Sequence, residues 1–169
     1  LDSCMPEWIA TVQRQQRSVT CDQSDRVNLN IDMVFIMIDI DHFKRVNDQY
    51  GHQAGDRVLR QFGEVLRSVT RTSDSVARWG GEEFLVVARN ASRANASIPV
   101  ERIRKAVEDH VFDIGDGRSI RCTCSLGFSV YPLVPCDSET FGWEQIVAIA
   151  DTCLYVAKHN GRDAWVGIV

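Results

Sequence analysis

The residues of this chain whose types and spacing best suit chemistry are two glycines followed by two carboxylates, Gly80-Gly81-Glu82-Glu83. Extended segments flank them, so residues 75–88 are predicted to form a β-hairpin in which Gly-Gly supplies the positive φ angles of a tight turn. A turn without side chains lets a large ligand approach the backbone, and carboxylates are the ligands that Mg²⁺ prefers. The motif alone leaves a second interpretation open, a solvated hairpin tip whose acids only add solubility.

A second acidic pair closes the most apolar segment of the chain. Residues 33–38 form a continuous apolar run, typical of a strand buried on both faces, and Asp39-Ile40-Asp41 follow it. Alternation along a strand places Asp39 and Asp41 on the same face. They have a structural interpretation, as capping or ion-pairing groups. If they meet Glu82 and Glu83 across neighbouring strands, however, the acids repel one another unless a divalent cation neutralises them, and two metal ions bracketing a phosphoryl group are one use of such a cluster.

The elements that position these acids follow from hydrophobic periodicity. Helices are predicted within residues 1–17, 58–69, 99–111 and 143–159, and further strands at 119–131, interrupted by Gly127, and at 164–169. Residues 18–31 and 132–142 are predicted loops, 44–55 form a polar segment, and Gly161 occupies a helix C-cap position. This order predicts an α+β fold, with an antiparallel or mixed sheet and helices mostly on one face.

Composition sets limits on the function. The length of 169 residues suits one domain, predicted to span 1–169, and the net charge of −4 gives no overall basic field for a nucleic-acid polymer or an anionic membrane. No apolar stretch approaches the ~18 residues needed to span a bilayer. The six cysteines lack zinc-site spacing, which favours free thiols in a cytoplasmic domain, whatever tether the parent protein has. The absence of an initiator Met or a signal pattern suggests a fragment of a longer protein.

Three segments resemble one family. Residues 39–48 continued by 51–56 are similar to the nucleotide-binding half of GGDEF domains, Gly80 to Phe84 resembles the GGEEF variant of their signature, and 157–163 resembles their K-x-x-G-R ending. The motifs occur in family order over residues 33–169. The family consists of diguanylate cyclases, which join two GTP molecules into cyclic di-GMP and release pyrophosphate. The resemblance implies a β-α-β-β-α-β, ferredoxin-like core, as in polymerase palms and nucleotidyl cyclases.

The resemblance also implies roles for individual residues. The catalytic residues would be Asp39, Glu82 and Lys44. The metal ligands would be Asp39, the Ile40 carbonyl, Glu82 and Glu83, holding Mg²⁺, two per site, with Mn²⁺ as an alternative. Asn47 and Asp56 would bind guanine, since an amide and a carboxylate match its donors and acceptors. Lys44, Lys158 and Arg162 would hold the triphosphate, and His42, Phe43, Gly80 and Gly81 would complete the substrate site.

The same resemblance implies assembly and regulation. One domain holds one GTP, so catalysis would need a homodimer with a composite site. The R-x-x-D sequence of Arg71 and Asp74 lies where the family binds its product as an inhibitor, with Arg102 as a further contact from the same or a neighbouring domain. The family's opening D-x-L-T-G-L-x-N-R-R segment is absent, so the chain is expected to start inside the first helix, without its regulatory domain. An inactive receptor for GTP or cyclic di-GMP, and a cyclase with relaxed base choice, are the alternatives.

Overall fold

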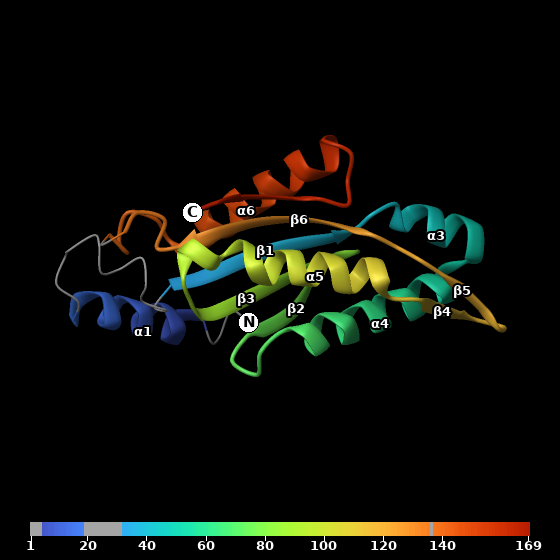
Figure 1. The fold of residues 1–169 in the computed structure, drawn as a ribbon, viewed down its shortest axis with the longest axis horizontal. Coiled ribbons are helices and arrows are strands. Elements are labelled where there is room, and N and C mark those ends of the chain that lie inside the picture. The colour runs from blue at the N-terminus through green and yellow to red at the C-terminus, as the bar shows by residue number, and fades with distance from the viewer. Residues whose placement is uncertain (1–4, 19–31, 136) are drawn as a thin grey trace.

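A five-stranded sheet forms the centre of the molecule (Figure 1). The computed structural model describes residues 5–18, 32–135 and 137–169. The strands lie in the order β2 (Ser75–Gly80), β3 (Glu83–Ala91), β1 (Asp32–Ile40), β6 (Cys124–Tyr131) and β7 (Trp165–Ile168). All neighbours are antiparallel except β6 and β7, which are parallel. The sheet is therefore mixed and mostly antiparallel, as the sequence predicts.

Strand β1 is buried along its whole length and separates two apolar clusters. Val34, Ile36 and Ile38 pack in one cluster with α4 (His52–Val69) and α5 (Ser97–Asp109). Met33 and Phe35 pack in the other with α1 (Met5–Ser18) and α6 (Trp143–His159). Helices therefore cover both faces, and the prediction of helices mostly on one face is wrong. A strand that is apolar at consecutive positions needs an apolar layer on each side.

The core connectivity confirms the predicted β-α-β-β-α-β unit. Helices α3 (Phe43–Tyr50) and α4 join β1 to β2, the β2–β3 hairpin follows, and η1 (Arg93–Asn95) and α5 lead towards β6. A small hairpin of β4 (Phe112–Gly115) and β5 (Arg118–Ile120) is inserted between α5 and β6, beyond the end of the main sheet (Figure 1). This arrangement brings the ends of β1 and β3, with their acidic residues, to one edge of the sheet beside α3.

The sequence assigned no secondary structure to the polar segment 44–55, which forms most of α3 and the start of α4. Phe43 and Val46 are buried one turn apart and anchor α3 on the main core. One sequence prediction needs correction. The strand predicted for 119–131 is two strands, β5 and β6, separated by 121–123, and β4 was not predicted. The loop predicted for 18–31 lies almost entirely outside the described residues.

Gly127 lies in the middle of β6 and does not interrupt it. A Cβ at this position would lie 2.1 Å from the Ala150 carbonyl oxygen and 2.1 Å from the Leu154 backbone nitrogen, both in α6. The absence of a side chain thus lets α6 pack directly against the sheet, which fixes where the C-terminal end of α6 lies.

The described cysteines, Cys122, Cys124 and Cys153, are buried and unbonded, and Cys122 and Cys124 lie in one apolar cluster. Cys4, Cys21 and Cys136 lie outside the described residues. None of the helices in the described part of the chain is both long enough and apolar enough to cross a bilayer.

Candidate active site

The glycine turn is a hairpin end shaped by its own residues. The Arg78 Nε donates a hydrogen bond of 2.8 Å to the Gly81 carbonyl oxygen, and Gly81 has a φ of +50°. The β2–β3 register is irregular between Arg78 and Gly80, and such an irregularity increases the local twist of the hairpin beside the turn. An added Cβ at Gly80 or Gly81 would meet no atom within 4 Å. The backbone of the turn is therefore open to a ligand.

The turn places two carboxylates beside Asp39. Glu83 is the register partner of Asp39 across β1 and β3, and Glu82 is the residue before it. Asp39 is buried, with 5% of its surface exposed, and its Oδ2 lies 2.7 Å from the Lys158 Nζ. The predicted convergence of Asp39 with Glu82 is thus present, with a lysine from α6 added to it.

The carboxylates at this edge resist ionisation. Burial raises the pKa of Asp39, and the charge of Asp41 adds to this, although Lys158 and Arg162 act in the opposite direction. Burial likewise raises the pKa of Glu82, with the charges of Asp39 and Glu83 adding to it against Lys158. Desolvation outweighs the ion pair at Asp39 because a buried carboxylate loses most of its hydration. Such a pair of acids gains from a nearby cation.

Asp41 has the structural role that its sequence position left open. Its two carboxylate oxygens accept hydrogen bonds from Thr123 Oγ1 at 2.7 Å, Ser125 Oγ at 2.7 Å and the Asp163 backbone N–H at 3.0 Å. It therefore ties β1 to β6 and to the turn after α6. Its charge still contributes to the raised pKa of Asp39.

The α3–α4 corner carries the residues predicted to contact the base. Asn47 lies against Gly55, since a Cβ on Gly55 would be 2.0 Å from the Asn47 Oδ1. Asp56 is exposed near the start of α4. Phe43 is buried at the start of α3, and a Cβ on Gly55 would also lie 3.2 Å from its Cζ. The corner thus holds an amide and a carboxylate on adjacent helices.

The predicted phosphate-binding residues come from two places. Lys158, in the last turn of α6, and Arg162, just after it, both act electrostatically on Asp39. Lys44 is exposed on the first turn of α3 and makes no ion pair with any described residue. His42, two residues earlier, has a φ of +57°. The structure therefore groups Lys158 and Arg162 with the acids, while Lys44 projects from the neighbouring helix.

A metal ion fits this donor set in chemical type. Asp39 and Glu82 are partly desolvated oxygen donors that repel each other, and Ile40 ends β1 beside them. In the described part of the chain, no group of three His, Cys, Asp or Glu side chains already has the spacing of a metal site. The set of Asp39, Ile40, Glu82 and Glu83 therefore stays a prediction, with two carboxylates brought together here.

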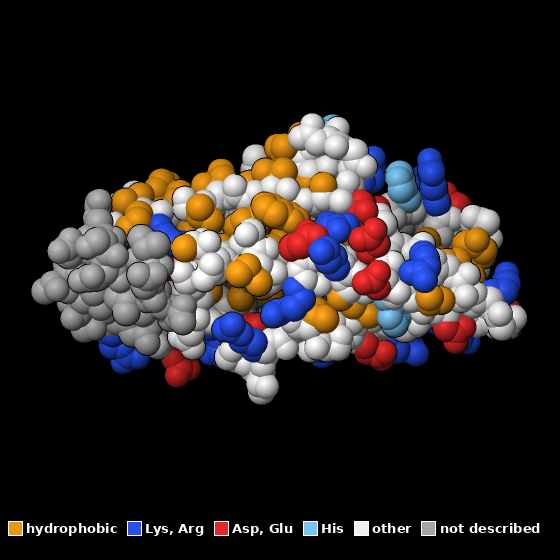
Figure 2. All heavy atoms as spheres, viewed as in Figure 1, with side chains coloured by type: hydrophobic (Ala, Val, Ile, Leu, Met, Phe, Trp, Pro, Cys, Tyr) orange, Lys and Arg blue, Asp and Glu red, His pale blue; other side chains and the backbone are white. Residues whose placement is uncertain are grey.

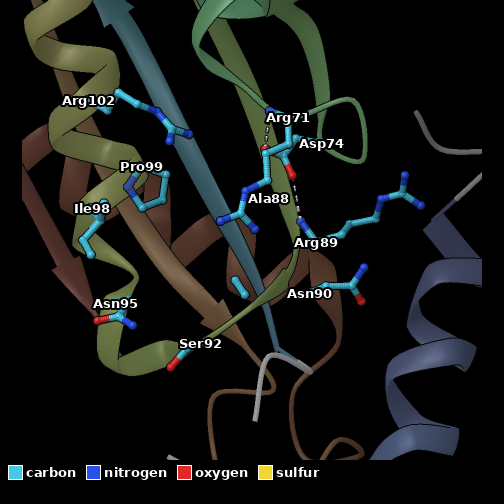
Figure 3. Close-up of a pocket in the computed structure, with 11 residues that line it drawn as sticks. Arg71, Asp74, Ala88, Arg89, Asn90, Ser92, Asn95, Ile98, Pro99 and Arg102 are labelled. Atoms are coloured by element: carbon cyan, nitrogen blue, oxygen red, sulfur yellow. Dashed lines mark hydrogen bonds between the residues drawn. The ribbon is translucent and has the colours of Figure 1, made fainter. Parts of the chain in front are cut away.

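Arg71, Asp74 and Arg102 line one hollow of about 250 Å³ at the far end of β3 (Figure 3). Asp74 organises its floor, because its Oδ2 accepts from the Arg71 backbone N–H at 2.9 Å and its Oδ1 from the Arg89 N–H at 3.4 Å. In Figure 3, Arg71 and Arg102 approach from opposite walls, whereas the Arg89 side chain extends towards α1, where its guanidinium lies 4.5 Å from the Trp8 ring centroid. Sequence reasoning missed Arg89, although its place on β3 beside the R-x-x-D loop was a usable signal.

Comparison with known proteins gives concordant matches. The family model described as diguanylate cyclase, GGDEF domain, matches residues 16–164. Diguanylate cyclase A of Treponema denticola is 46% identical over 128 residues, which cover 76% of this chain and 33% of that protein. The chain thus spans about a third of the length of this relative.

Solved structures agree. Diguanylate cyclase SiaD of Pseudomonas aeruginosa, in complex with its activator SiaC, has a TM-score of 0.78 and 30% identity, covering 98% of this chain and 57% of that one. The active GGEEF domain of a diguanylate cyclase from Vibrio cholerae has a TM-score of 0.76 and 28% identity, covering 99% and 96%. Both share the mixed sheet flanked by helices.

Proposed function

Because this chain belongs to the GGDEF family of diguanylate cyclases, we propose that it joins two GTP molecules into cyclic di-GMP and releases pyrophosphate. The observation that carries the proposal is the grouping of Asp39, Glu82 and Lys158 at the edge of the sheet. Two desolvated acids and a basic side chain from a separate helix suit a metal-bound triphosphate. We place the reaction in the cytoplasm, where GTP is available.

GTP would lie between the α3–α4 corner and the Gly80-Gly81 turn. Asn47 and Asp56 bind guanine, whose ring N–H and amine are adjacent donors, whereas the corresponding ring nitrogen of adenine is an acceptor. Lys44, Lys158 and Arg162 bind the triphosphate, and the open backbone at Gly80 and Gly81 leaves room for it. This division supports a site that selects the base with α3 and α4 and holds the phosphates with Lys44 of α3 together with the end of α6 and the turn that follows it.

Asp39, the Ile40 carbonyl, Glu82 and Glu83 would hold Mg²⁺, with Mn²⁺ as an alternative. When bound, the metal neutralises charge on the phosphates. The residues of the chain supply the rest: Asp39 and Glu82 give oxygen ligands, and Lys158 is released from its ion pair to meet the triphosphate. Glu82 has a second candidate role, as the base that accepts the proton of the attacking hydroxyl.

The reaction requires two domains. The 3′-oxygen of one GTP bonds to the α-phosphorus of the other, the bond between the α-phosphorus and the bridging oxygen breaks, pyrophosphate leaves, and the hydroxyl proton passes to a base or to solvent. The same displacement in the reciprocal direction closes the ring and releases the second pyrophosphate. A single domain offers one such triphosphate site, so we propose a two-fold homodimer. Its specific activity should rise with protein concentration, and an activity per chain that is independent of concentration would contradict the composite site.

We further propose that the hollow with Arg71, Asp74 and Arg102 binds cyclic di-GMP and inhibits the enzyme. Two guanidinium groups on opposite walls suit a ligand with two phosphates. The same hollow also favours the second candidate function, a catalytically inactive receptor for GTP or cyclic di-GMP.

Incubation of the chain with GTP or with ATP, in Mg²⁺, followed by mass spectrometry separates these functions. Cyclic di-GMP from GTP alone supports the cyclase. Binding without product, measured by calorimetry, supports the receptor, and a cyclic product from ATP indicates relaxed base choice.

A further inference from the structure

The turn after α6 holds consecutive residues in the left-handed backbone region. The φ angle is +112° at Gly161, +64° at Arg162 and +43° at Asp163. Glycine adopts such angles freely, but residues with a Cβ adopt them rarely and keep them only where surrounding contacts fix the backbone. The contacts of Asp163 therefore identify what keeps the neighbouring Arg162 in place.

Two backbone contacts secure this turn. The Arg162 N–H donates to the Ala157 carbonyl oxygen at 3.2 Å, which caps α6. The Asp163 N–H donates to the Asp41 Oδ2 at 3.0 Å. Asp41 is itself buried and held by β6, so one end of the turn is attached to the sheet edge that carries Asp39.

The side chain of Asp163 has a third contact, with Arg104 of α5. The Arg104 Nη1 lies 2.6 Å from the Asp163 Oδ1 and 3.0 Å from a Glu108 carboxylate oxygen. Its Nε and Nη2 each donate to Glu101 at 3.1 Å, so the guanidinium is fixed in its plane. Only 15% of the Arg104 side chain is exposed. Figure 2 shows acidic and basic side chains gathered over the C-terminal half of α5, where this group lies.

We propose that Arg104 is a positioning residue for the triphosphate: by its ion pair with Asp163 it holds Arg162 in the left-handed conformation that presents the Arg162 guanidinium to the active site. This inference rests on the proposed function, in which Arg162 binds the phosphates of GTP. Arg104 touches no substrate in this scheme. Its effect passes through Asp163 and the backbone of the turn.

Two observations connect the turn to the site. The turn follows directly on the last turn of α6, whose Lys158 Nζ lies 2.7 Å from the Asp39 Oδ2. The Asp163 backbone is bonded to Asp41, two residues from Asp39. The ion pairs of Arg104 with described residues go to Glu101, Glu108 and Asp163, and none reaches the Asn47 corner. A change at Arg104 is therefore expected to act on the phosphate side of the site.

The alternative is that Arg104 only fastens α5 to the C-terminal turn. The two roles differ in which ligand contacts they affect. We propose to measure binding of 3′-deoxy-GTP, which lacks the attacking hydroxyl, and of GMP, which lacks the outer phosphates, by calorimetry with Mg²⁺. Arg104→Met should weaken 3′-deoxy-GTP binding by about tenfold and GMP binding by less than about twofold.

A double-mutant cycle tests whether Arg104 acts through Arg162. Arg162→Ala should weaken 3′-deoxy-GTP binding, and adding Arg104→Met should weaken it further by less than about twofold, because the lost contact is the same one. Lys105→Met is the matched control: it removes the same charge from the same helix, but the Lys105 side chain is 64% exposed, and its ion pair with Glu101, at 3.8 Å, is long. Its affinity for both ligands should stay within about twofold of wild type.

Asp163→Asn provides a second variant if Arg104→Met does not fold, since it keeps the backbone bond to Asp41 and removes the charge partner. The same selective loss of 3′-deoxy-GTP binding is expected. Equal losses of affinity for both ligands, independent losses of affinity in the cycle, or unchanged affinity in Asp163→Asn would each overturn this inference and leave the proposed function standing. A wild-type chain that binds neither ligand would refute the proposed function, and the inference with it.

Discussion

Gly55→Ala is expected to damage guanine binding without unfolding the protein. Gly55 lies in the first turn of α4, where a new Cβ would be 2.0 Å from the Asn47 Oδ1 and 3.2 Å from the Phe43 Cζ. The atom in closest conflict is the end of a flexible side chain. Asn47 should therefore rotate away while the backbone of both helices stays in place.

The magnitudes separate stability from function. Alanine in place of glycine inside a helix favours folding by about 1 kcal/mol, which offsets the cost of moving Asn47, so the free energy of unfolding should change by less than about 1 kcal/mol. Losing one hydrogen bond to guanine costs about 1 kcal/mol, and leaving a buried partner unsatisfied costs about 3 kcal/mol. Binding of GTP should therefore weaken by roughly 5- to 150-fold.

The assay is calorimetric binding of 3′-deoxy-GTP to Gly55→Ala, Asn47→Ala and the double variant, with urea unfolding of each. The two changes should not add, because both remove the same contact. Gly63→Ala is the stability control in the same helix, since its Cβ would lie 3.7 Å and 3.8 Å from the nearest atoms, of Arg67 and Phe84. Wild-type affinity in Gly55→Ala, or independent losses in the double variant, would refute Asn47 as a guanine contact.

Other changes test the remaining parts of the structure. Arg71→Ala should raise steady-state turnover by abolishing product inhibition, and an unchanged inhibition constant for cyclic di-GMP would remove the hollow from the regulatory scheme. Gly127→Ala should destabilise the protein by about 3 kcal/mol or more, because α6 must move off the sheet, and an unshifted urea midpoint would contradict that close approach. Glu82→Gln should stabilise the ligand-free protein at neutral pH by up to about 1 kcal/mol, with no difference well below the ordinary carboxyl pKa. Mg²⁺ should raise the unfolding midpoint of wild type and not of Glu82→Gln; equal shifts would argue against Glu82 as a ligand.

The sequence predicts the elements with strong periodicity and misses those that depend on context. The apolar run of β1, the Gly-Gly hairpin and the long helices appear at nearly the right residues. Helix α3 was missed because its sequence is mostly polar and only Phe43 and Val46 anchor it. The all-apolar run at 33–38 already implied a layer on each face, but nothing in the sequence assigns a given helix to a given side.

The candidate site likewise has some residues that the sequence predicts and others that only the packing of the elements reveals. The types and spacing of Asp39 and Glu82 identify them as acids at strand ends, and the sheet register brings them together. The sequence cannot reveal Arg104 beside Asp163, because 59 residues separate them and only the packing of α5 near β7 joins them. Arg89 is similar: its stacking on Trp8 depends on where α1 docks.

Asp39 and Glu82, the acids at this end of the sheet, lower the stability of the ligand-free fold at neutral pH. Burial raises the pKa values of Asp39 and Glu82, so the native protein holds these protons more tightly than the unfolded chain. As the pH rises through the ordinary pKa values, the unfolded chain releases its protons first, and stability falls until the raised native values are passed. At neutral pH both carboxylates therefore lower the free energy of unfolding. A bound divalent cation would remove that loss by neutralising them, which is the physical argument for the proposed metal site.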